Sequence, residues 1–211
     1  MPGPEILLLF MGAALVLNLT PGQDMMYVAA RSVSDGRAAG IVSAFGVAAG
    51  LLLHVSALAL GLSALLAAAP LAYTLIRVAG AVYLIFLGLR LLFRPGGVTQ
   101  AANPARSPLR VVFLQGVITN ALNAKVALFF LAFLPQFVDP AAGPVVPQIV
   151  LLGLLFNVQG TVVNLVVAVL ASEGTAWLRS NERRVMILQR LTGIVFLGLG
   201  SRLALTGSMD Y

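Results

Sequence analysis

An apolar run from Ile6 to Ala30 is interrupted midway, and this interruption constrains the fold more than any other feature. The run is long enough to cross a lipid bilayer, for which about 20 apolar residues suffice. Its centre holds a proline, a glycine and an acid within Asn18-Leu19-Thr20-Pro21-Gly22-Gln23-Asp24. In hydrocarbon every backbone polar group needs a partner, so a broken helix is tolerated only where protein or a water-filled cavity surrounds it. We therefore interpret residues 18–24 as the floor of a transport site.

The composition predicts an integral membrane protein that contacts the lipid bilayer. Of the 211 residues, 60% are hydrophobic and 9% are charged, whereas soluble domains carry about 25% charged residues. The formal net charge of +6 comes from Lys125 and from arginines near or between apolar segments. This arrangement suits membrane orientation better than nucleic-acid binding. Cysteine is absent, which excludes disulfides, thiolate metal sites and thiol redox chemistry, and no cofactor is expected.

Six apolar segments are long enough to span a bilayer if tilted. They cover Ile6 to Ala30, Ala39 to Ala68, Leu71 to Phe93, Val111 to Leu134, Val145 to Ala171 and Val185 to Leu205. The sequence therefore predicts an all-α membrane protein: one transporter domain, residues 1–211, with six transmembrane helices, the first broken at Thr20-Pro21-Gly22. The second and third segments are separated mainly by Pro70, so a five-span arrangement is an open alternative.

The arginines predict the orientation in the membrane. With six spans, the loops around Pro70 and Asp139-Pro140 carry no Lys or Arg, and the opposite side carries Arg31, Arg37, Arg94, Arg106, Arg110, Arg179, Arg183 and Arg184. Cytoplasmic loops collect such cations, so both termini are expected to be non-cytoplasmic.

The two halves of the chain resemble each other. Residues 77–84 (Arg-Val-Ala-Gly-Ala-Val-Tyr-Leu) match residues 190–197 (Arg-Leu-Thr-Gly-Ile-Val-Phe-Leu), although Gly and Leu also recur by chance in membrane helices. We interpret residues from about 5 to 93 and from about 110 to 205 as three-helix repeats, joined by a linker at 94–109. An odd number of spans per repeat makes the second copy enter the membrane from the opposite face. Transporters built from such inverted repeats have their sites near the bilayer midplane.

The break in the first span predicts one half of a substrate site. Thr20, Pro21, Gly22 and Gln23 have the form of a capping box with proline at the first helical position. A half-helix that begins there directs free N–H groups at a bound carboxylate. Asp24, in its first turn, is expected to hold an ammonium group or to take a proton. The simpler alternative is a proline kink whose polar groups satisfy each other.

The fourth span predicts the other half of the site. Asn120, Asn123 and Lys125 occupy the corresponding depth, where Asn123 can cap a second half-helix and Asn120 can line the cavity. A lone charge at a helix centre costs about 2.5–3.5 kcal/mol on insertion scales. Lys125 is therefore expected to form an intramembrane ion pair with Asp24. The alternative is that Lys125 extends to the membrane surface.

Two further polar patterns lie in the second and fifth spans. His54 shares a helical face with Ser43, Gly46 and Gly50. The small residues predict a close helix contact, within the chain or in a homodimer. His54 itself fits either a packed neutral side chain or a proton relay. The fifth span carries a stripe at helical spacing that either lines a polar path or joins helices: Asn157, Gly160, Thr161 and Asn164.

These motifs resemble the LysE/RhtB family of bacterial amino-acid exporters. The resemblance covers nearly the whole chain, through Asn18 to Asp24, Ala30 to Ser32, Gly36 to Gly40, Gly46 to His54, Gly80 to Gly88, Asn120 to Lys125 and Leu134 to Phe137. It implies a six-helix inner-membrane protein that exports amino acids or their derivatives by using the proton gradient. The chain departs from the family at Gln23 and Ala124, where the family has the second proline of each motif. Because Ala favours helix where Pro obstructs it, the fourth span is a candidate for a nearly continuous helix.

The sequence thus predicts a secondary exporter of small zwitterionic amino acids. The substrate carboxylate is expected at Thr20 to Gly22 and the ammonium group near Asp24, with Asn120, Asn123 and Lys125 completing the site. The alternative is a metal-cation exporter or channel, but hard cations prefer several carboxylates and Asp24 is the only acid deep in a span. An enzyme is not expected, because no nucleophile is matched with a base in the sequence.

Overall fold

The computed structural model describes residues 2–68 and 107–173, together with residues 78, 82, 85, 86, 89, 92, 93, 190, 194, 197, 198 and 201. Over these residues the protein is all-α, which confirms the predicted fold class. The third and sixth predicted spans, the linker, Pro70 and the matching motifs at 77–84 and 190–197 lie largely or wholly outside the described residues.

The first span is a broken helix, as predicted. α1 covers Pro4–Leu19 and α2 covers Gln23–Ser34, and the two helices are bent by 50° across residues 20–22. Each part is too short to cross a bilayer alone, since a span needs about 20 residues. The pair qualifies as one broken span by length and hydropathy.

The predicted capping box is not formed at this break. Thr20 is extended (φ −70°, ψ 122°), as is usual for a residue that precedes proline. Its hydroxyl donates back to the Val16 carbonyl of α1, at 2.7 Å. α2 begins only at Gln23, with Gly22 in the N-cap position and no side-chain cap. Thr20 therefore ends the first half-helix instead of beginning the second.

The fourth span is also broken, so of the two alternatives that the sequence left open, the nearly continuous helix is wrong. α5 covers Leu109–Ala121 and α6 covers Ala124–Leu128. The bend between Leu109–Ala121 and the helical segment Lys125–Phe137, which begins in α6, is 45°. The break forms without a proline because Asn123 caps α6: its Oδ1 accepts a hydrogen bond from the Lys125 backbone N–H at 3.0 Å. A side-chain oxygen at the N-cap satisfies a free N–H and so favours a new helix start. The prediction that Asn123 caps a second half-helix is confirmed.

Shorter helical turns follow α6. A π-helical turn, η1, covers Phe129–Phe133, and two 3-10 turns, η2 and η3, cover Leu134–Phe137 and Pro140–Ala142. They lead to α7, Val145–Glu173.

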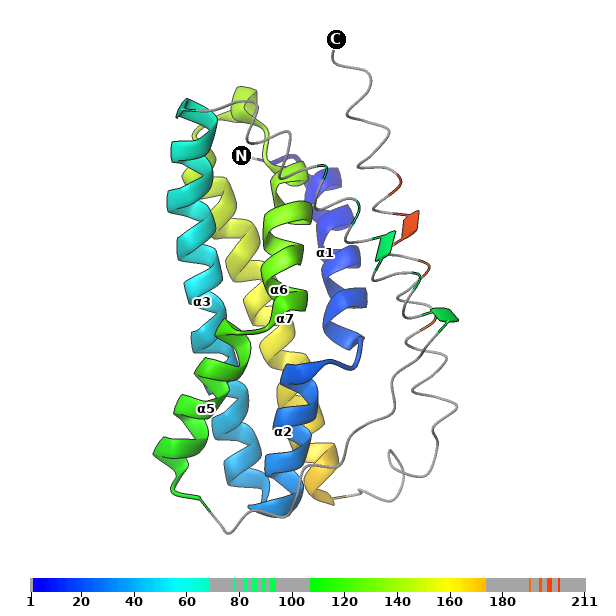
Figure 1. The fold of residues 1–211 in the computed structure, drawn as a ribbon, viewed down its shortest axis with the longest axis vertical. Coiled ribbons are helices and arrows are strands. Elements are labelled where there is room, and N and C mark those ends of the chain that lie inside the picture. The colour runs from blue at the N-terminus through cyan, green and yellow to red at the C-terminus, as the bar shows by residue number, and fades with distance from the viewer. Residues whose placement is uncertain are drawn as a thin grey trace.

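Two long helices, α7 and α3 (Arg37–Ala68), support the broken pairs. Each is long and apolar enough to cross a membrane, so the described residues contain two candidate spans, or four if each bent pair counts as one. Figure 1 shows that α1 and α2 run in the opposite direction to α5 and α6, with the two breaks at a similar height. The helix pairs α3–α5 and α3–α7 pack against each other.

Glycines bring α3 and α5 into close contact. A Cβ atom on Gly50 would lie 2.5 Å from the Val117 carbonyl oxygen, and one on Gly46 would collide with the Phe113 carbonyl. Backbone therefore packs against backbone, as the small residues of this face predicted. The Gly46–Gly50 face is covered by α5 of the same chain, so it is not the surface of a homodimer.

Candidate functional site

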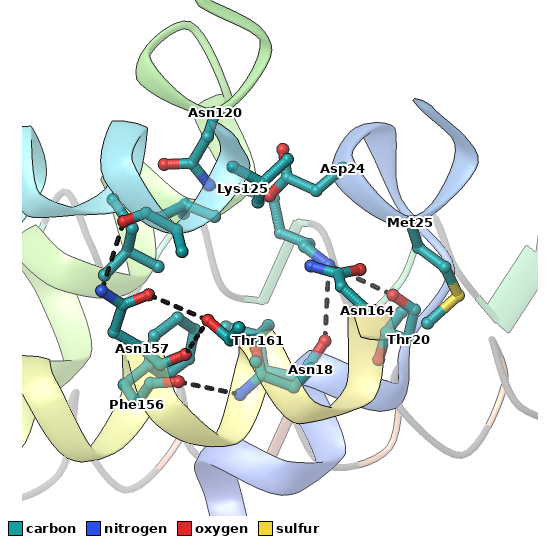
Figure 2. Close-up of a pocket in the computed structure, with 16 residues that line it drawn as sticks. Asn18, Thr20, Asp24, Met25, Asn120, Lys125, Phe156, Asn157, Thr161 and Asn164 are labelled. Atoms are coloured by element: carbon teal, nitrogen blue, oxygen red, sulfur yellow. Dashed lines mark hydrogen bonds between the residues drawn. The ribbon is translucent and has the colours of Figure 1, made fainter. Parts of the chain in front are cut away.

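The two helix breaks meet at a small polar cavity of about 30 Å³ (Figure 2). Thr20 and Asp24 line it from the first broken span, and Asn120 and Lys125 line it from the second. The remaining lining residues are Leu17, Asn18, Met25, Val47, Ala48, Leu51, Val126, Phe156, Asn157, Gly160, Thr161 and Asn164. The structure thus brings together residues separated by about half of the chain.

Asp24 is the centre of the polar contacts in this cavity. Its Oδ2 accepts hydrogen bonds from Nδ2 of Asn120, at 2.9 Å, and from Nδ2 of Asn123, at 2.8 Å. Its Oδ1 is buried with no hydrogen-bond partner, and so is Oδ1 of Asn120. Unpaired buried acceptors are costly and call for a donor. The polar groups of the break therefore do not satisfy each other, which argues against a mere proline kink.

Lys125 lies inside the protein, but the expected direct ion pair with Asp24 is not formed. Its Nζ donates to the backbone carbonyls of Leu17, at 3.3 Å, and Thr20, at 3.2 Å. In a continuous helix the Leu17 carbonyl would accept from residue 21, which here is a proline without an N–H. The Leu17 carbonyl instead accepts from the Thr20 backbone N–H, at 3.2 Å, and from the Lys125 amine. The alternative in which it extends to the membrane surface is wrong, because its amine is bound at the break.

Gly22 provides the space for this contact. A Cβ atom at this position would lie 2.8 Å from Lys125 Nζ and 3.2 Å from its Cε. The backbone of Gly22 is extended (φ −152°, ψ −173°), a conformation open to most residues. The absence of a side chain at Gly22 therefore lets the lysine approach. Pro21 has a different role, because it interrupts the helix and so forms the break.

His54 contacts the site from outside the cavity. Its Nε2 lies 2.9 Å from the Asn120 backbone carbonyl, and since a carbonyl only accepts, Nε2 is the donor. Asn120 thus accepts from His54 through its backbone and donates to Asp24 through its side chain. This contact fits both interpretations of His54, the packed side chain and the relay.

The polar stripe of the fifth span lines the cavity opposite Asp24 (Figure 2). Asn157 Nδ2 donates to the Ala48 carbonyl of α3 at 3.2 Å, and Thr161 Oγ1 donates to the Asn157 carbonyl at 2.7 Å. The stripe therefore both lines the cavity and joins α7 to α3. Asn18, which the sequence placed only in the motif, adds a link from α1, since its Nδ2 donates to Gln159 Oε1 at 3.3 Å.

A second polar cluster, beyond the breaks along α2, was not predicted as functional. Arg31 forms an ion pair with Asp35 Oδ2 at 2.7 Å, and its guanidinium also donates to Gln115 Oε1 (2.5 Å) and Ser107 Oγ (3.3 Å). Tyr27 lies under the guanidinium and donates to the Val112 carbonyl at 2.6 Å. We call Tyr27, Arg31, Asp35, Ser107 and Gln115 the Arg31 cluster. The i, i+4 spacing of Arg31 and Asp35 was the available signal.

Aromatic residues pack together on the other side of the breaks. Phe129 stacks on Phe156, a cavity residue, with ring centroids 4.8 Å apart. Phe133 contacts Phe137 at 4.7 Å, and Phe10 of α1 contacts Phe137 at 5.3 Å. These rings are almost completely buried. We call the following residues the aromatic cluster: Phe10, Phe129, Phe130, Phe133, Phe137 and Phe156.

Comparisons with known proteins show the family of this chain. The profile of the LysE type translocator family matches residues 15–207. The chain is 30% identical to a homoserine/homoserine lactone efflux protein of Salmonella typhimurium, over 90% of this chain and 91% of that one. It is 29% identical to an uncharacterized membrane protein, YrhP, of Bacillus subtilis, over 95% of this chain and 99% of that one. No solved structure matches significantly. The chain therefore belongs to the LysE type translocator family, and it is a membrane transporter and not an enzyme.

Proposed function

We propose that this chain is a secondary exporter of small zwitterionic amino acids or their derivatives, located in the bacterial inner membrane and coupled to the proton gradient. The observation that carries the proposal is a cavity lined by one acid, Asp24, and one base, Lys125, between two broken helices. One negative and one positive group fit a neutral zwitterion better than a dicationic or strongly acidic solute. The efflux activity named for the Salmonella relative supports the same class of substrate.

The two ends of the substrate would bind at different parts of the break. The first turn of α2 has no side-chain cap, so its free N–H groups and positive dipole end favour a carboxylate near Thr20, Pro21 and Gly22. The ammonium group would donate to the two unpaired acceptors, Oδ1 of Asp24 and Oδ1 of Asn120. From the second broken span, Asn123 would hold Asp24 in place and Lys125 would hold the break itself through the Leu17 and Thr20 carbonyls.

The cavity volume indicates a closed conformation. About 30 Å³ is room for roughly two water molecules and less than an amino acid requires. Transport would then need the cavity to open alternately toward each side. The aromatic cluster is the proposed barrier on the side of α1 and η1, and the Arg31 cluster is the proposed barrier on the side of α2 and the start of α5.

Two inverted repeats are the proposed moving units. The opposite directions of the two broken helices (Figure 1) and their similar bends of 50° and 45° support this proposal. Rocking of one repeat against the other about a site near the midplane is the usual mode of such transporters. Arg31, Arg37 and Arg110 lie near helix ends on the same side of the breaks, which supports a cytoplasmic position for that side and non-cytoplasmic termini.

Protonation of Asp24 is the proposed coupling step. Asp24 is the only acid among the described residues that line the cavity. A protonated carboxyl group no longer attracts an ammonium group, so a proton and the substrate would compete for Asp24. Exchange of one for the other across the membrane gives antiport. His54, hydrogen-bonded to Asn120, is either a packed side chain that holds Asn120 in place or a relay for this proton.

Export of labelled homoserine from loaded vesicles tests the proposal. Asp24→Asn should abolish export and its response to an imposed pH gradient, whereas Glu5→Gln, which changes an exposed acid near the N-terminus, should leave both unchanged. Undiminished, pH-responsive export by Asp24→Asn would refute the role of Asp24. Among the described residues no three of His, Asp and Glu come together, so no observation favours the metal-cation alternative.

A further inference from the structure

The amine of Lys125 lies among oxygen atoms that favour a bound cation. It is bound by the carbonyl oxygens of Leu17 and Thr20 at the end of α1. The C-terminal end of a helix carries partial negative charge, because its last carbonyls lack the usual N–H partner four residues further on. The Leu17 carbonyl accepts the Thr20 backbone N–H at 3.2 Å in addition to the amine. The break between α1 and α2 therefore presents a set of oxygen atoms to whatever lies beside it.

The same oxygen set resembles the ion sites of other transporters with broken helices. In such transporters, unwound carbonyls and half-helix C-terminal ends coordinate Na⁺. Here Asp24 adds a carboxylate that lines the same cavity, and Gly22 carries no side chain that would meet the amine. Carbonyl and carboxylate oxygens are the ligands that hard cations prefer.

We infer that Lys125 Nζ fills a monovalent-cation site formed by the Leu17 and Thr20 carbonyls next to Asp24, and so replaces a free metal ion. An ammonium group has three donors, and two of them are used on these carbonyls. Lys125 therefore acts as a tethered cation that stabilises the break. Its consequence for transport, export that needs neither Na⁺ nor K⁺, rests on the proposed function.

Removal of the tethered amine tests the site without any transport assay. Lys125→Ala leaves both the oxygen set and the space, whereas Lys125→Met leaves the oxygens but fills the space with an apolar chain. We would measure thermal unfolding of each purified protein in Na⁺, Li⁺, K⁺ or methylammonium, with N-methylglucamine, which is too large for the site, as the reference at equal ionic strength. Lys125→Ala should gain a saturable rise in melting temperature of about 2–4 °C with at least one small cation. Wild type and Lys125→Met should show none.

Each outcome decides the inference. Identical melting of Lys125→Ala in all five salts would overturn it, and so would a Na⁺-dependent melting temperature of the wild type. If Lys125→Ala cannot be purified in N-methylglucamine, recovery of monodisperse protein in a small cation supports the site, and failure in every salt overturns it. Absence of homoserine export by the wild type would refute the proposed function but not the site. Wild-type export that requires Na⁺ would refute the tethered-cation role alone.

Discussion

Asn123 joins the two broken helices through Asp24, because its Nδ2 donates to Asp24 Oδ2 at 2.8 Å while its Oδ1 caps α6. One side chain thus fixes the start of a half-helix in the fourth span and the orientation of the acid in the first. The position of Asp24 in the cavity therefore depends on a break that lies 99 residues further along the chain.

Asn123→Ala should remove both contacts. The lost cap and the lost donor to a buried carboxylate together should lower the free energy of unfolding by about 1–3 kcal/mol, measured by denaturant unfolding in micelles, and should reduce export. Asn123→Asp separates the two roles, since it keeps a capping oxygen but places a second carboxylate against Asp24. It should therefore fold better than Asn123→Ala and still fail to export. Leu122→Ala, at a side chain that is 74% exposed, is the control and should resemble the wild type.

Gly22→Ala should displace the amine of Lys125 without unfolding the protein. The added methyl group meets the flexible end of the lysine side chain, and the extended backbone of Gly22 accepts alanine. We expect a folded protein with a lowered melting temperature, because the displaced amine no longer stabilises the break, and a large loss of export. Gly12→Ala in α1, where a Cβ would contact nothing within 4 Å, should keep the melting temperature and the export of the wild type. A Gly22→Ala protein with full export would contradict the need for the lysine at the break.

The parts of this site that could be predicted are those with a local signal in the sequence. Pro21 and Gly22 locate the first break, and spacing along one helix places Asn157, Thr161 and Asn164 on the cavity. The sequence left the second break open, because Ala124 favours a continuous helix and Asn123 favours a new helix start; in the structure the cap of Asn123 prevails. The partners of Lys125 were missed. Charge alone favoured Asp24, but the chain is broken at residues 20–22, and the amine binds the Leu17 and Thr20 carbonyls beside that break.

His54→Gln distinguishes the two roles of this residue. Glutamine keeps a donor that can reach the Asn120 carbonyl but cannot carry a proton at physiological pH. Because Nε2 is engaged as a donor in this structure, we expect His54→Gln to retain the dependence of export on pH. His54→Leu removes the hydrogen bond and should lower the free energy of unfolding by about 0.5–1.5 kcal/mol. Loss of the pH response in His54→Gln, at unchanged stability, would instead identify His54 as the relay.

Gly50→Ala should destabilise the packing of α3 on α5. The new methyl group would meet the Val117 carbonyl oxygen and the Cβ of Asn120, and backbone atoms cannot move aside without separating the helices. Overpacking of this kind costs about 1–3 kcal/mol. Gly61→Ala, in the same helix but with nothing within 4 Å of the new atom, is the matched control. Equal unfolding midpoints for Gly50→Ala and Gly61→Ala would show that α3 can move away from α5 at this contact without loss of stability.

The Arg31 cluster should hold the cavity closed from the arginine-rich side. Arg31 ties α2 to α5 through Gln115, and the side chain of its partner Asp35 is 3% exposed. Arg31→Met leaves the buried Asp35 carboxylate without its ion-pair partner and should lower the free energy of unfolding by about 3–5 kcal/mol. The double variant, Arg31→Met with Asp35→Leu, should recover much of this loss. Arg110→Gln, at an exposed arginine, should cost little.

Opening of the cavity can be followed separately from stability. The chain has no cysteine, so a single Thr161→Cys substitution reports the access of a membrane-impermeant thiol reagent to the cavity. In inside-out vesicles the stable double variant, Arg31→Met with Asp35→Leu, should be labelled faster than the Thr161→Cys protein alone, because its α2 no longer binds α5 through the guanidinium. Equal labelling rates in the two proteins would mean that the Arg31 cluster stabilises the fold and does not gate the cavity.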